Sequence, residues 1–389
     1  MSFPLKGIKV LELARVLAGP WAGQTLSDLG ADVIKVESPD GDETRKWGPP
    51  FVEGHQGPLD SAYFHSCNRG KRSIVLDFKT EEGLNTAQKL ASKSDIIIEN
   101  FKVNTLSKYN LDYESIFLKN PKIIYCSITG FGQTGPYSKK PGYDYIIQAL
   151  SGIMDLTGEP NGDPQKMGVA FADIFTGLYG VIAIQSALKE REISGKGQNI
   201  DLSLMDSMTA VLANQASNYF VSGKSPSRLG NKHPNIVPYQ TFPTIDGYLI
   251  IAVGNNQQFE RLCEALDLLE LLKSDDFLTN EKRIQNRDLI VDLISSKTKK
   301  YKRKTLQKVL ENHSVPVGVV NKLEDVFNDE QIIHRSLKIE MPHTEAIKGN
   351  TIGLRTPIKF SKSSLNLTKG VPLLGEHTDE ILDELDSID

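Results

Sequence analysis

The sequence predicts an α/β protein with a large domain, built on a doubly wound and mostly parallel sheet, and a smaller α+β domain. Three observations lead to this fold class. Apolar β-type runs alternate with helical patterns through the first 130 residues, as repeated βαβ units do. A segment rich in Pro, Gly, Ser and Asn at 217–240 is typical of a linker. The length of 389 residues also favours two or three domains.

The large domain is expected to begin with a βαβ unit. Residues 7–13 (GIKVLEL) and 31–37 (ADVIKVE) have the composition of buried strands, and a loop and a helix fill 16–30 between them. Such a unit has parallel strands and a right-handed crossover. Further strands are expected at 71–78, 94–101, 122–130 and within 194–208, an amphipathic helix at 81–94, and a buried apolar helix at 169–188.

We expect the large domain to comprise 1–218, completed by 326–389, and the linker and small domain to comprise 219–325. The stretch 38–58 is rich in Gly, Pro and charge and is expected to be a surface loop. The elements expected after the linker are a hairpin-like strand at 244–254, helices at 256–269, 274–296 and 304–312, strands at 315–321 and 352–361, and an acidic terminal helix.

Charge and cysteine content exclude several classes of function. A formal net charge of −4 gives no basic surface, so no nucleic-acid partner is expected. Three widely spaced cysteines fit neither a disulfide framework nor a zinc cluster and suit a reducing compartment. No leader is visible, so we expect a cytoplasmic protein, or one of the mitochondrial matrix if a leader was removed. Asp173 and two glycines interrupt the only long apolar run, which favours a core helix over a membrane span.

A Gly-x-Gly-x-x-Gly pattern at Gly130, Gly132 and Gly135 directly follows an expected strand. A dinucleotide fingerprint requires a helix to begin there, so that its first amides meet the pyrophosphate. Pro136 and a loop follow instead, which disfavours a dinucleotide-binding oxidoreductase, so no nicotinamide or flavin is expected. The chain also lacks Gly-x-Ser-x-Gly, His-Glu-x-x-His, Walker and Cys-x-x-Cys patterns, so neither a serine nucleophile nor a metal is expected.

Asp173 is the only charged residue between 169 and 188. Carboxylates are seldom buried without a partner, because loss of hydration is costly. The residues alone leave three roles open for Asp173: helix cap, member of a buried ion pair, or nucleophile. A carboxylate is nucleophilic at neutral pH without a base, and the nearby Phe171 and Phe175 suit a dry pocket. Because burial would raise its pKa, N–H donors or a cation would be needed to keep it ionised.

Nine ordered segments span nearly the whole chain: LELARVLAGP, GADVIKVE, GKRSIVLD, ENF, SITGFGQTGP, PGYD, FADIFTGLYG, GKGQNIDLSLMDSM and LLGEHT. Together they resemble the class III CoA-transferase family, of the CaiB/BaiF type. The resemblance implies a two-domain α/β fold in an interlocked homodimer, with acyl-CoA as a substrate. It also implies that an aspartate, here Asp173, takes the acyl group from the thioester as a mixed anhydride and then becomes an aspartyl-CoA thioester.

The resemblance further implies a set of CoA-binding residues. Val16 and Leu17 match a loop that touches CoA through its backbone, and Tyr143 and Asp144 match a Tyr–acid pair near the thioester. A phosphate-binding arginine of some members corresponds to Ser38 here, so another cation must supply its charge. The residues expected to line the nucleotide and pantetheine are Leu76, Lys79, Asn100, Phe101, Lys102 and Lys108, and the candidate replacement cations are Arg45, Lys71, Arg72 and Lys79.

The acceptor acid is inferred from the linker and the strand after it. This region lacks the glycine-only loop of oxalate-specific members and resembles members that transfer CoA from succinyl-CoA to glutarate. A 2-methylacyl-CoA racemase is the alternative on the same fold; it is disfavoured because such racemases carry His at the position of Tyr143. A dicarboxylate needs a cation or several donors for its far carboxylate. The candidates, each of which could instead belong to a polar linker, are Arg228, Lys232, His233, Tyr239, Gln240 and Asn255.

Overall fold

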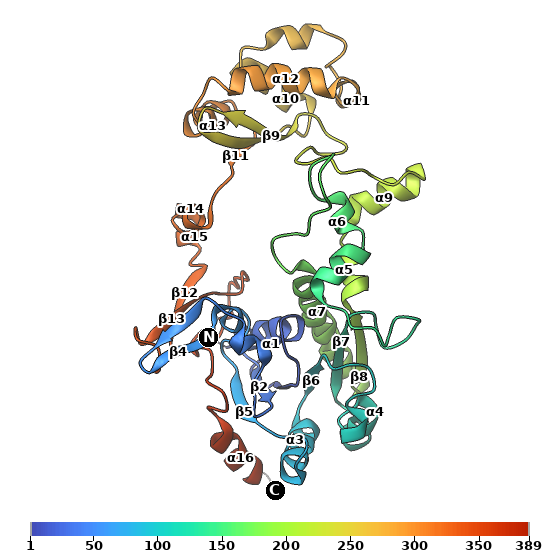
Figure 1. Cartoon of the computed structure of the whole chain (residues 1–389), viewed down its shortest axis with the longest axis vertical. Coiled ribbons are helices and arrows are strands. Elements are labelled where there is room, and N and C mark those ends of the chain that lie inside the picture. The colour runs from blue at the N-terminus through green and yellow to red at the C-terminus, as the bar shows by residue number, and fades with distance from the viewer. Residues whose placement is uncertain (1, 388–389) are drawn as a thin grey trace. The chain divides into compact units, whose positions relative to one another are not determined.

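The computed structural model describes residues 2–387, and the chain forms two compact units (Figure 1). The first comprises Met1–Ile153, Lys166–Ser222 and Gln331–Asp389, and the second comprises Met154–Gln165 and Gly223–Glu330. The segment 154–165, which the sequence placed in the large domain, belongs to the second unit. Within that unit Arg228 pairs with Asp155 at 3.1 Å, which ties this segment to the residues after 223.

A six-stranded parallel sheet organises the first unit. Its strand order is β5-β2-β1-β6-β7-β8, and every neighbouring pair is parallel. Counted along the chain, this is the 3-2-1-4-5-6 order of a doubly wound sheet, so the predicted architecture of this unit is confirmed. Each strand lies within a range expected from the sequence: β1 (Lys9–Glu12), β2 (Asp32–Glu37), β5 (Arg72–Val75), β6 (Ile96–Glu99), β7 (Ile124–Thr129) and β8 (Gln198–Ser203).

Helices cover both faces of the sheet, and each face has its own apolar core (Figure 1). Successive strand residues point to opposite faces, so Val10 contributes to one core and Leu11 to the other. α1 and α7 pack over the first face, and α3, α4 and α16 contribute to the core on the second. The bounds are α1 (Ala18–Asp28), α7 (Phe171–Ser194), α3 (Glu81–Lys93), α4 (Tyr113–Lys119) and α16 (Thr378–Asp386).

α7 contains the apolar run and crosses α1 at close range. At Gly177 a Cβ atom would lie 2.6 Å from the Ala18 carbonyl oxygen, so the crossing requires glycine. Among the described residues, α7 is the one helix that, judged by length and composition alone, could span a membrane. Its buried residues pack against α1, β7 and β8, so one face of the helix lies in the core, but only 39% of its apolar window is buried and the expectation of a fully buried helix is wrong.

The stretch 38–58, expected to be a loop, contains regular structure. A 3-10 helix, η1 (Glu43–Lys46), precedes an antiparallel hairpin of β3 (Phe51–Gly54) and β4 (Gly57–Ser61). The hairpin is held from far along the chain, since Gly54 forms a bridge with Ala346. Further elements are α2 (Ala62–His65), η2 (Ser107–Tyr109), α5 (Asp144–Leu150), α6 (Ile153–Leu156), α8 (Leu204–Ala210), α9 (Ala213–Ser222), α15 (Glu330–His334) and the antiparallel pair β12 (Lys338–Pro342) and β13 (Asn350–Leu354).

The second unit contains a three-stranded antiparallel sheet in the order β11-β10-β9, with a core of its own. The start of the expected linker is helical, because α9 extends to Ser222. The helix expected at 274–296 begins only at Asn280 and is divided at Asn286, whose φ of −106° and ψ of 28° are not helical. The bounds are β9 (Tyr239–Thr244), β10 (Gly247–Ala252), β11 (Val317–Val319), α10 (Asn256–Ala265), η3 (Leu269–Lys273), α11 (Asn280–Gln285), α12 (Arg287–Thr298), α13 (Arg303–Asn312) and α14 (Leu323–Phe327).

Candidate active site

A pocket of about 330 Å³ opens at the carboxyl-terminal edge of the parallel sheet. Loops after β1, β6 and β7 line it, together with the first turns of α1 and α7. Its position between β1 and β6 is the topological switch point, where doubly wound sheets bind ligands. The predicted site residues that line it are Val16, Leu17, Asn100, Phe101, Lys102, Tyr143 and Asp173.

Asp173 lies in the first turn of α7, at the wall of this pocket. No side chain of the preceding residues caps this helix. The cap comes instead from Asp144, whose Oδ1 accepts hydrogen bonds from the backbone N–H groups of Ala172 (2.8 Å) and Asp173 (3.4 Å). Asp144 therefore satisfies two amides that would otherwise lack an acceptor at the helix start, and it fixes the turn that carries Asp173.

The carboxyl group of Asp173 is electrostatically unusual. Burial, followed by the nearby charge of Asp144, raises its pKa from 3.8 to about 7. The position at the positive end of α7 favours the anion, although not enough to offset these two effects. At neutral pH the side chain is therefore divided between its carboxylate and its protonated form, and a cationic or N–H-rich ligand would shift it toward the carboxylate.

Asp144 is itself held in place by a second buried side chain. Gln148 Nε2 donates to Asp144 Oδ2 (2.7 Å), and Gln148 Oε1 accepts from the backbone N–H of Met167 (2.9 Å). Gln148 is completely buried. This chain of hydrogen bonds connects α5 to the start of α7, so the cap of the Asp173 turn is rigidly supported.

A second depression, of about 240 Å³, continues from the first. Arg15 and Phe101 line both. The guanidinium carbon of Arg15 lies 5.8 Å from the centre of the Phe101 ring, a cation–π distance. Leu76 and Lys79, which the family resemblance assigns to the nucleotide, line this second depression, and Lys108 lies outside it with its ammonium 4.6 Å from the centre of the Tyr109 ring.

Three cations of the Asp173 pocket were not predicted as site residues: Arg15, Lys139 and Lys140. Lys139 and Lys140 follow the glycine-rich loop after β7, and the next helix, α5, begins only at Asp144. The prediction that no helix starts at those glycines is therefore confirmed. The rule that loops at the carboxyl ends of parallel strands carry ligand-binding groups would have identified both lysines.

Arg45, Lys71 and Arg72, expected to supply phosphate-binding charge, are not brought to the Asp173 pocket. Arg45 is buried in ion pairs with Glu37 (2.7 Å) and Asp60 (2.6 Å). The other two cations are likewise buried and paired, because carboxylates on neighbouring strands and on α16 reach them. These pairs are Lys71 with Glu12 (2.8 Å), and Arg72 with Asp32, Glu380 (2.9 Å) and Glu384 (2.9 Å).

The predicted acceptor residues all lie in the second unit, and several have local partners there. Asn255 caps α10, its Oδ1 accepting from the Gln258 N–H (2.9 Å). The rings of His233 and Tyr239 are 5.1 Å apart. The remaining contacts are Arg228 with Asp155 (3.1 Å), Lys232 with Asp288 (3.4 Å), and the buried Gln240 Nε2 with Thr241 O (3.5 Å).

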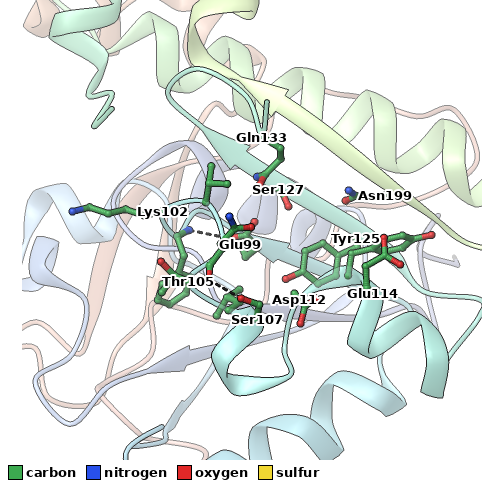
Figure 2. Close-up of a pocket in the computed structure, with 15 residues that line it drawn as sticks. Glu99, Lys102, Thr105, Ser107, Asp112, Glu114, Tyr125, Ser127, Gln133 and Asn199 are labelled. Carbon is green, nitrogen blue, oxygen red and sulfur yellow. Dashed lines mark hydrogen bonds between the residues drawn. The ribbon is translucent and has the colours of Figure 1, made fainter. Parts of the chain in front are cut away.

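A further pocket, of about 190 Å³, shares Phe101, Lys102, Val103 and Thr105 with the lining of the Asp173 pocket. Figure 2 shows the residues that line it. Glu99, at the end of β6, points into it beside Ser127 and Gln133 (Figure 2). Its Oε2 accepts a hydrogen bond from the Phe101 N–H (2.8 Å). Burial raises the pKa of Glu99 to about 7. Because Phe101 also lines the Asp173 pocket, Glu99 supports a wall of that pocket from behind.

No cluster of three or more His, Cys, Asp or Glu side chains that could hold a metal ion occurs among residues 2–387. The three cysteines are free and buried. The charged side chains that line the Asp173 pocket with this carboxyl group are Arg15, Glu43, Lys102, Lys139 and Lys140.

Comparison with known proteins defines the class of enzyme. The model of CoA-transferase family III matches residues 5–378. A succinate–glutarate CoA-transferase of Agrobacterium fabrum is 53% identical over 389 residues, covering 99% of this chain and 96% of the relative. The succinyl-CoA:glutarate CoA-transferase of Mus musculus is 44% identical, covering 98% and 86%. The crystal structure of a CaiB/BaiF family protein from Brucella suis has a TM-score of 0.89 and 57% identity, covering 99% of this chain and all of that one.

These matches extend over nearly the whole chain and agree with the architecture of its sheet. The chain is a transferase that uses CoA thioesters as substrates. It belongs to CoA-transferase family III, as the ordered sequence segments predicted.

Proposed function

We propose that this enzyme transfers CoA from succinyl-CoA to glutarate, with Asp173 as the nucleophile. The observation that carries the proposal is the partly buried Asp173 carboxyl at the switch-point pocket, held by Asp144. Two relatives at 53% and 44% identity are named for succinate or succinyl-CoA and glutarate, which supports this choice of donor and acceptor.

The proposed reaction balances without a metal or redox group. An Asp173 oxygen attacks the succinyl carbonyl carbon and the C–S bond breaks. CoA departs as its thiolate, and the product on the enzyme is a mixed anhydride of Asp173 and succinate. The thiolate then attacks the Asp173 carbonyl carbon, which releases succinate and forms an aspartyl-CoA thioester. A glutarate carboxylate attacks this thioester and gives a second anhydride and thiolate. Attack of the thiolate on the glutaryl carbonyl carbon yields glutaryl-CoA and restores the Asp173 carboxylate.

The surrounding residues supply orientation and charge in this scheme. Asp144 and α7 hold the Asp173 turn, and the first amides of α1 lie at the same pocket, where negative charge develops on the thioester oxygen. Lys139 and Lys140 would bind the anionic parts of acyl-CoA. Lys79 and Arg15 line the adjoining depression, where the nucleotide would lie.

The covalent step can be tested by trapping. Incubation with succinyl-CoA followed by borohydride or hydroxylamine should label the peptide that spans 168–180, and Asp173→Asn should abolish the label. Absence of label from wild-type protein that is turning over would refute Asp173 as the nucleophile. Exchange of the α-proton of a 2-methylacyl-CoA with solvent, without CoA transfer, would instead indicate a racemase.

The pH dependence gives a second test. The nucleophile is the carboxylate, and the pKa of Asp173 is raised to about 7 by burial and Asp144. kcat/KM for succinyl-CoA should therefore fall about tenfold per unit as the pH decreases below 7, and level off above it. A flat profile between pH 5 and 8 would contradict this assignment.

We also propose that the enzyme is a homodimer whose subunits cover the apolar surface of α5, α7 and α9. Large apolar side chains on these helices are exposed, and Val221 is 90% exposed. Two of these helices, α5 and α7, pack against each other, and large contiguous apolar patches are rare on soluble monomers. Light scattering should give twice the mass of the chain, whereas a monomer at micromolar concentration would refute the proposal. The side chains are Tyr145, Ile146, Leu150, Leu178, Tyr179, Ile182, Tyr219, Phe220 and Val221.

A further inference from the structure

A cluster of fully buried charges lies behind the Val16 wall of the Asp173 pocket. Glu12, Lys35, Asp42 and Lys71 are each at most 1% exposed. Glu12 Oε1 accepts from Lys71 (2.8 Å) and from Lys35 (3.2 Å). Lys35 also pairs with Asp42 Oδ2 (3.0 Å). Replacing such a cluster with apolar residues is often neutral or stabilising, so stability alone does not account for it.

The cluster holds the backbone that leads from β1 into α1. Its side chains bind this segment at its beginning, its middle and its end, which leaves the segment little freedom to move. The three hydrogen bonds run from Lys35 Nζ to Ala14 O (2.9 Å), from the Val16 N–H to Asp42 Oδ2 (3.3 Å), and from Lys71 Nζ to Pro20 O (3.0 Å).

The middle of this segment needs support, because Val16 has a φ of 71°. This φ lies in the left-handed region of backbone conformation, which a β-branched residue adopts only when its surroundings impose it. Asn100 in the neighbouring loop also restrains the segment: its Oδ1 accepts from the Arg15 N–H (2.9 Å), and its Nδ2 donates to Arg15 O (2.6 Å). Val16 thus forms a wall of the pocket in a conformation that it would not keep alone.

We propose that Lys35 and Asp42 are positioning residues for CoA-thioester binding, because they hold the Val16 peptide in its left-handed conformation beside Asp173. Lys35 is completely buried and lines neither depression, so it acts through Asp42 and Val16. This inference rests on the proposed function, since it takes the Asp173 pocket as the acyl-CoA site.

The test compares Lys35→Met with Arg69→Met in the full-length enzyme. Both variants replace a buried, paired cation with an apolar side chain, since Arg69 is 2% exposed and pairs with Asp28. Arg69 lines neither depression. Both should lower Tm. Only Lys35→Met should raise the KM for succinyl-CoA and the calorimetric Kd for free CoA, each by about tenfold, with a smaller change in kcat.

Val16→Gly in the Lys35→Met background should recover part of the lost affinity for CoA, because glycine adopts a positive φ without strain. A general loss of stability would not be corrected by this change. If Lys35→Met does not fold, Asp42→Asn replaces it in the same comparison, because it preserves the side-chain volume and removes the charge.

An unchanged Kd for CoA in the Lys35 or Asp42 variant, or an equal rise in Arg69→Met, would overturn the inference. The calorimetric measurement needs no turnover. A wild-type protein that binds CoA but transfers nothing to glutarate would therefore refute the proposed function alone.

Discussion

Two sets of carboxyl groups lie near the same edge of the parallel sheet and differ in their electrostatics. Glu37 and Asp42 are buried beside cations. Burial alone would raise the pKa of Glu37, but the hydrogen bonds from Arg45 and the charge of Lys35 lower it. In the described part of the chain Glu99 is buried and Asp173 is half-buried, and neither has an ion-pair partner. Burial raises the pKa of each to about 7, and the charge of Asp144 adds to this effect for Asp173.

The difference shows how one sheet edge separates structure from chemistry. A carboxylate with a fixed cation is ionised at neutral pH and acts as a structural anchor. A carboxyl group without one remains near its titration point, where it can accept a charged ligand or react. Loss of a paired carboxylate or of its cation should therefore lower stability, with Asp42 also affecting CoA binding through Val16, whereas loss of an unpaired carboxyl group should change catalysis or substrate binding more than stability.

The largest effect is expected for Asp173→Asn. If Asp173 is the nucleophile, the side-chain amide that replaces its carboxylate cannot form the anhydride. Turnover should then fall by about 10⁴-fold or more, which is the size of effect seen when a catalytic nucleophile is removed. The turnover rate is measured by chromatography of the CoA esters formed during transfer from succinyl-CoA to glutarate. Tyr145→Phe is the control, because it changes an exposed neighbour on α5 and should retain activity. Activity of Asp173→Asn within tenfold of wild type would contradict the role of Asp173.

Arg45→Met should destabilise the fold without weakening acyl-CoA binding. It leaves the buried Glu37 and the half-buried Asp60 without this cation, which costs about 3–5 kcal/mol in the free energy of unfolding. Denaturant unfolding measures this loss, and the KM for succinyl-CoA should stay unchanged. Lys79→Ala is the opposite case: this exposed lysine lines the nucleotide depression, so its loss should raise KM and leave stability unchanged. A raised KM in Arg45→Met would restore Arg45 as a phosphate ligand.

Asp173→Asn should also make the protein more stable at high pH. The pKa of Asp173 is 3.8 unperturbed and about 7 in the fold, so folding is favoured by its protonated form. This contribution is complete below pH 3.8 and is lost as the pH rises through 7, a cost of about 2–4 kcal/mol. Urea unfolding should show the variant to be more stable at pH 8, with the gain decreasing toward pH 5. Asp42→Asn should show the opposite change in stability, a loss at pH 8. The reason is that Lys35 and Thr44 lower the pKa of Asp42 against the effect of burial, so its carboxylate favours folding.

Most of the sheet could be predicted because parallel strands buried on both faces are continuous apolar runs, and 96–99 (IIIE) is an example. The hairpin β3–β4 could not, because its stretch is polar and its bridge is to Ala346, far along the chain. The division of the helix at Asn286 depends on local backbone geometry that periodicity does not reveal.

The candidate site was predictable where a residue stood out from its surroundings. Asp173 is the one charge in a long apolar run, and the family resemblance identified its neighbour Asp144. Arg45 and Lys71 were predicted as cations of the CoA site and are instead paired with buried carboxylates, because sequence alone does not show which carboxylates reach them. Which cation a carboxylate meets is decided by packing between strands, and this is the information that a linear motif lacks.

The smallest expected effect tests the second unpaired carboxyl group. Glu99 supports the pocket through the Phe101 N–H (2.8 Å), and a carboxylate accepts this hydrogen bond more strongly than an amide does. Glu99→Gln preserves the shape and an acceptor, so the KM for succinyl-CoA at pH 8 should rise only about threefold to fivefold, equivalent to about 1 kcal/mol. Because the pKa of Glu99 is about 7, the difference from wild type should vanish near pH 5.5, where both side chains are neutral. Asp112→Asn is the matched control: it lines the same pocket, but its Oδ1 accepts from Ser115 Oγ (2.7 Å) and not from Phe101. An equal effect in both variants, or a difference that persists at pH 5.5, would show that Glu99 supports the fold and not the binding wall.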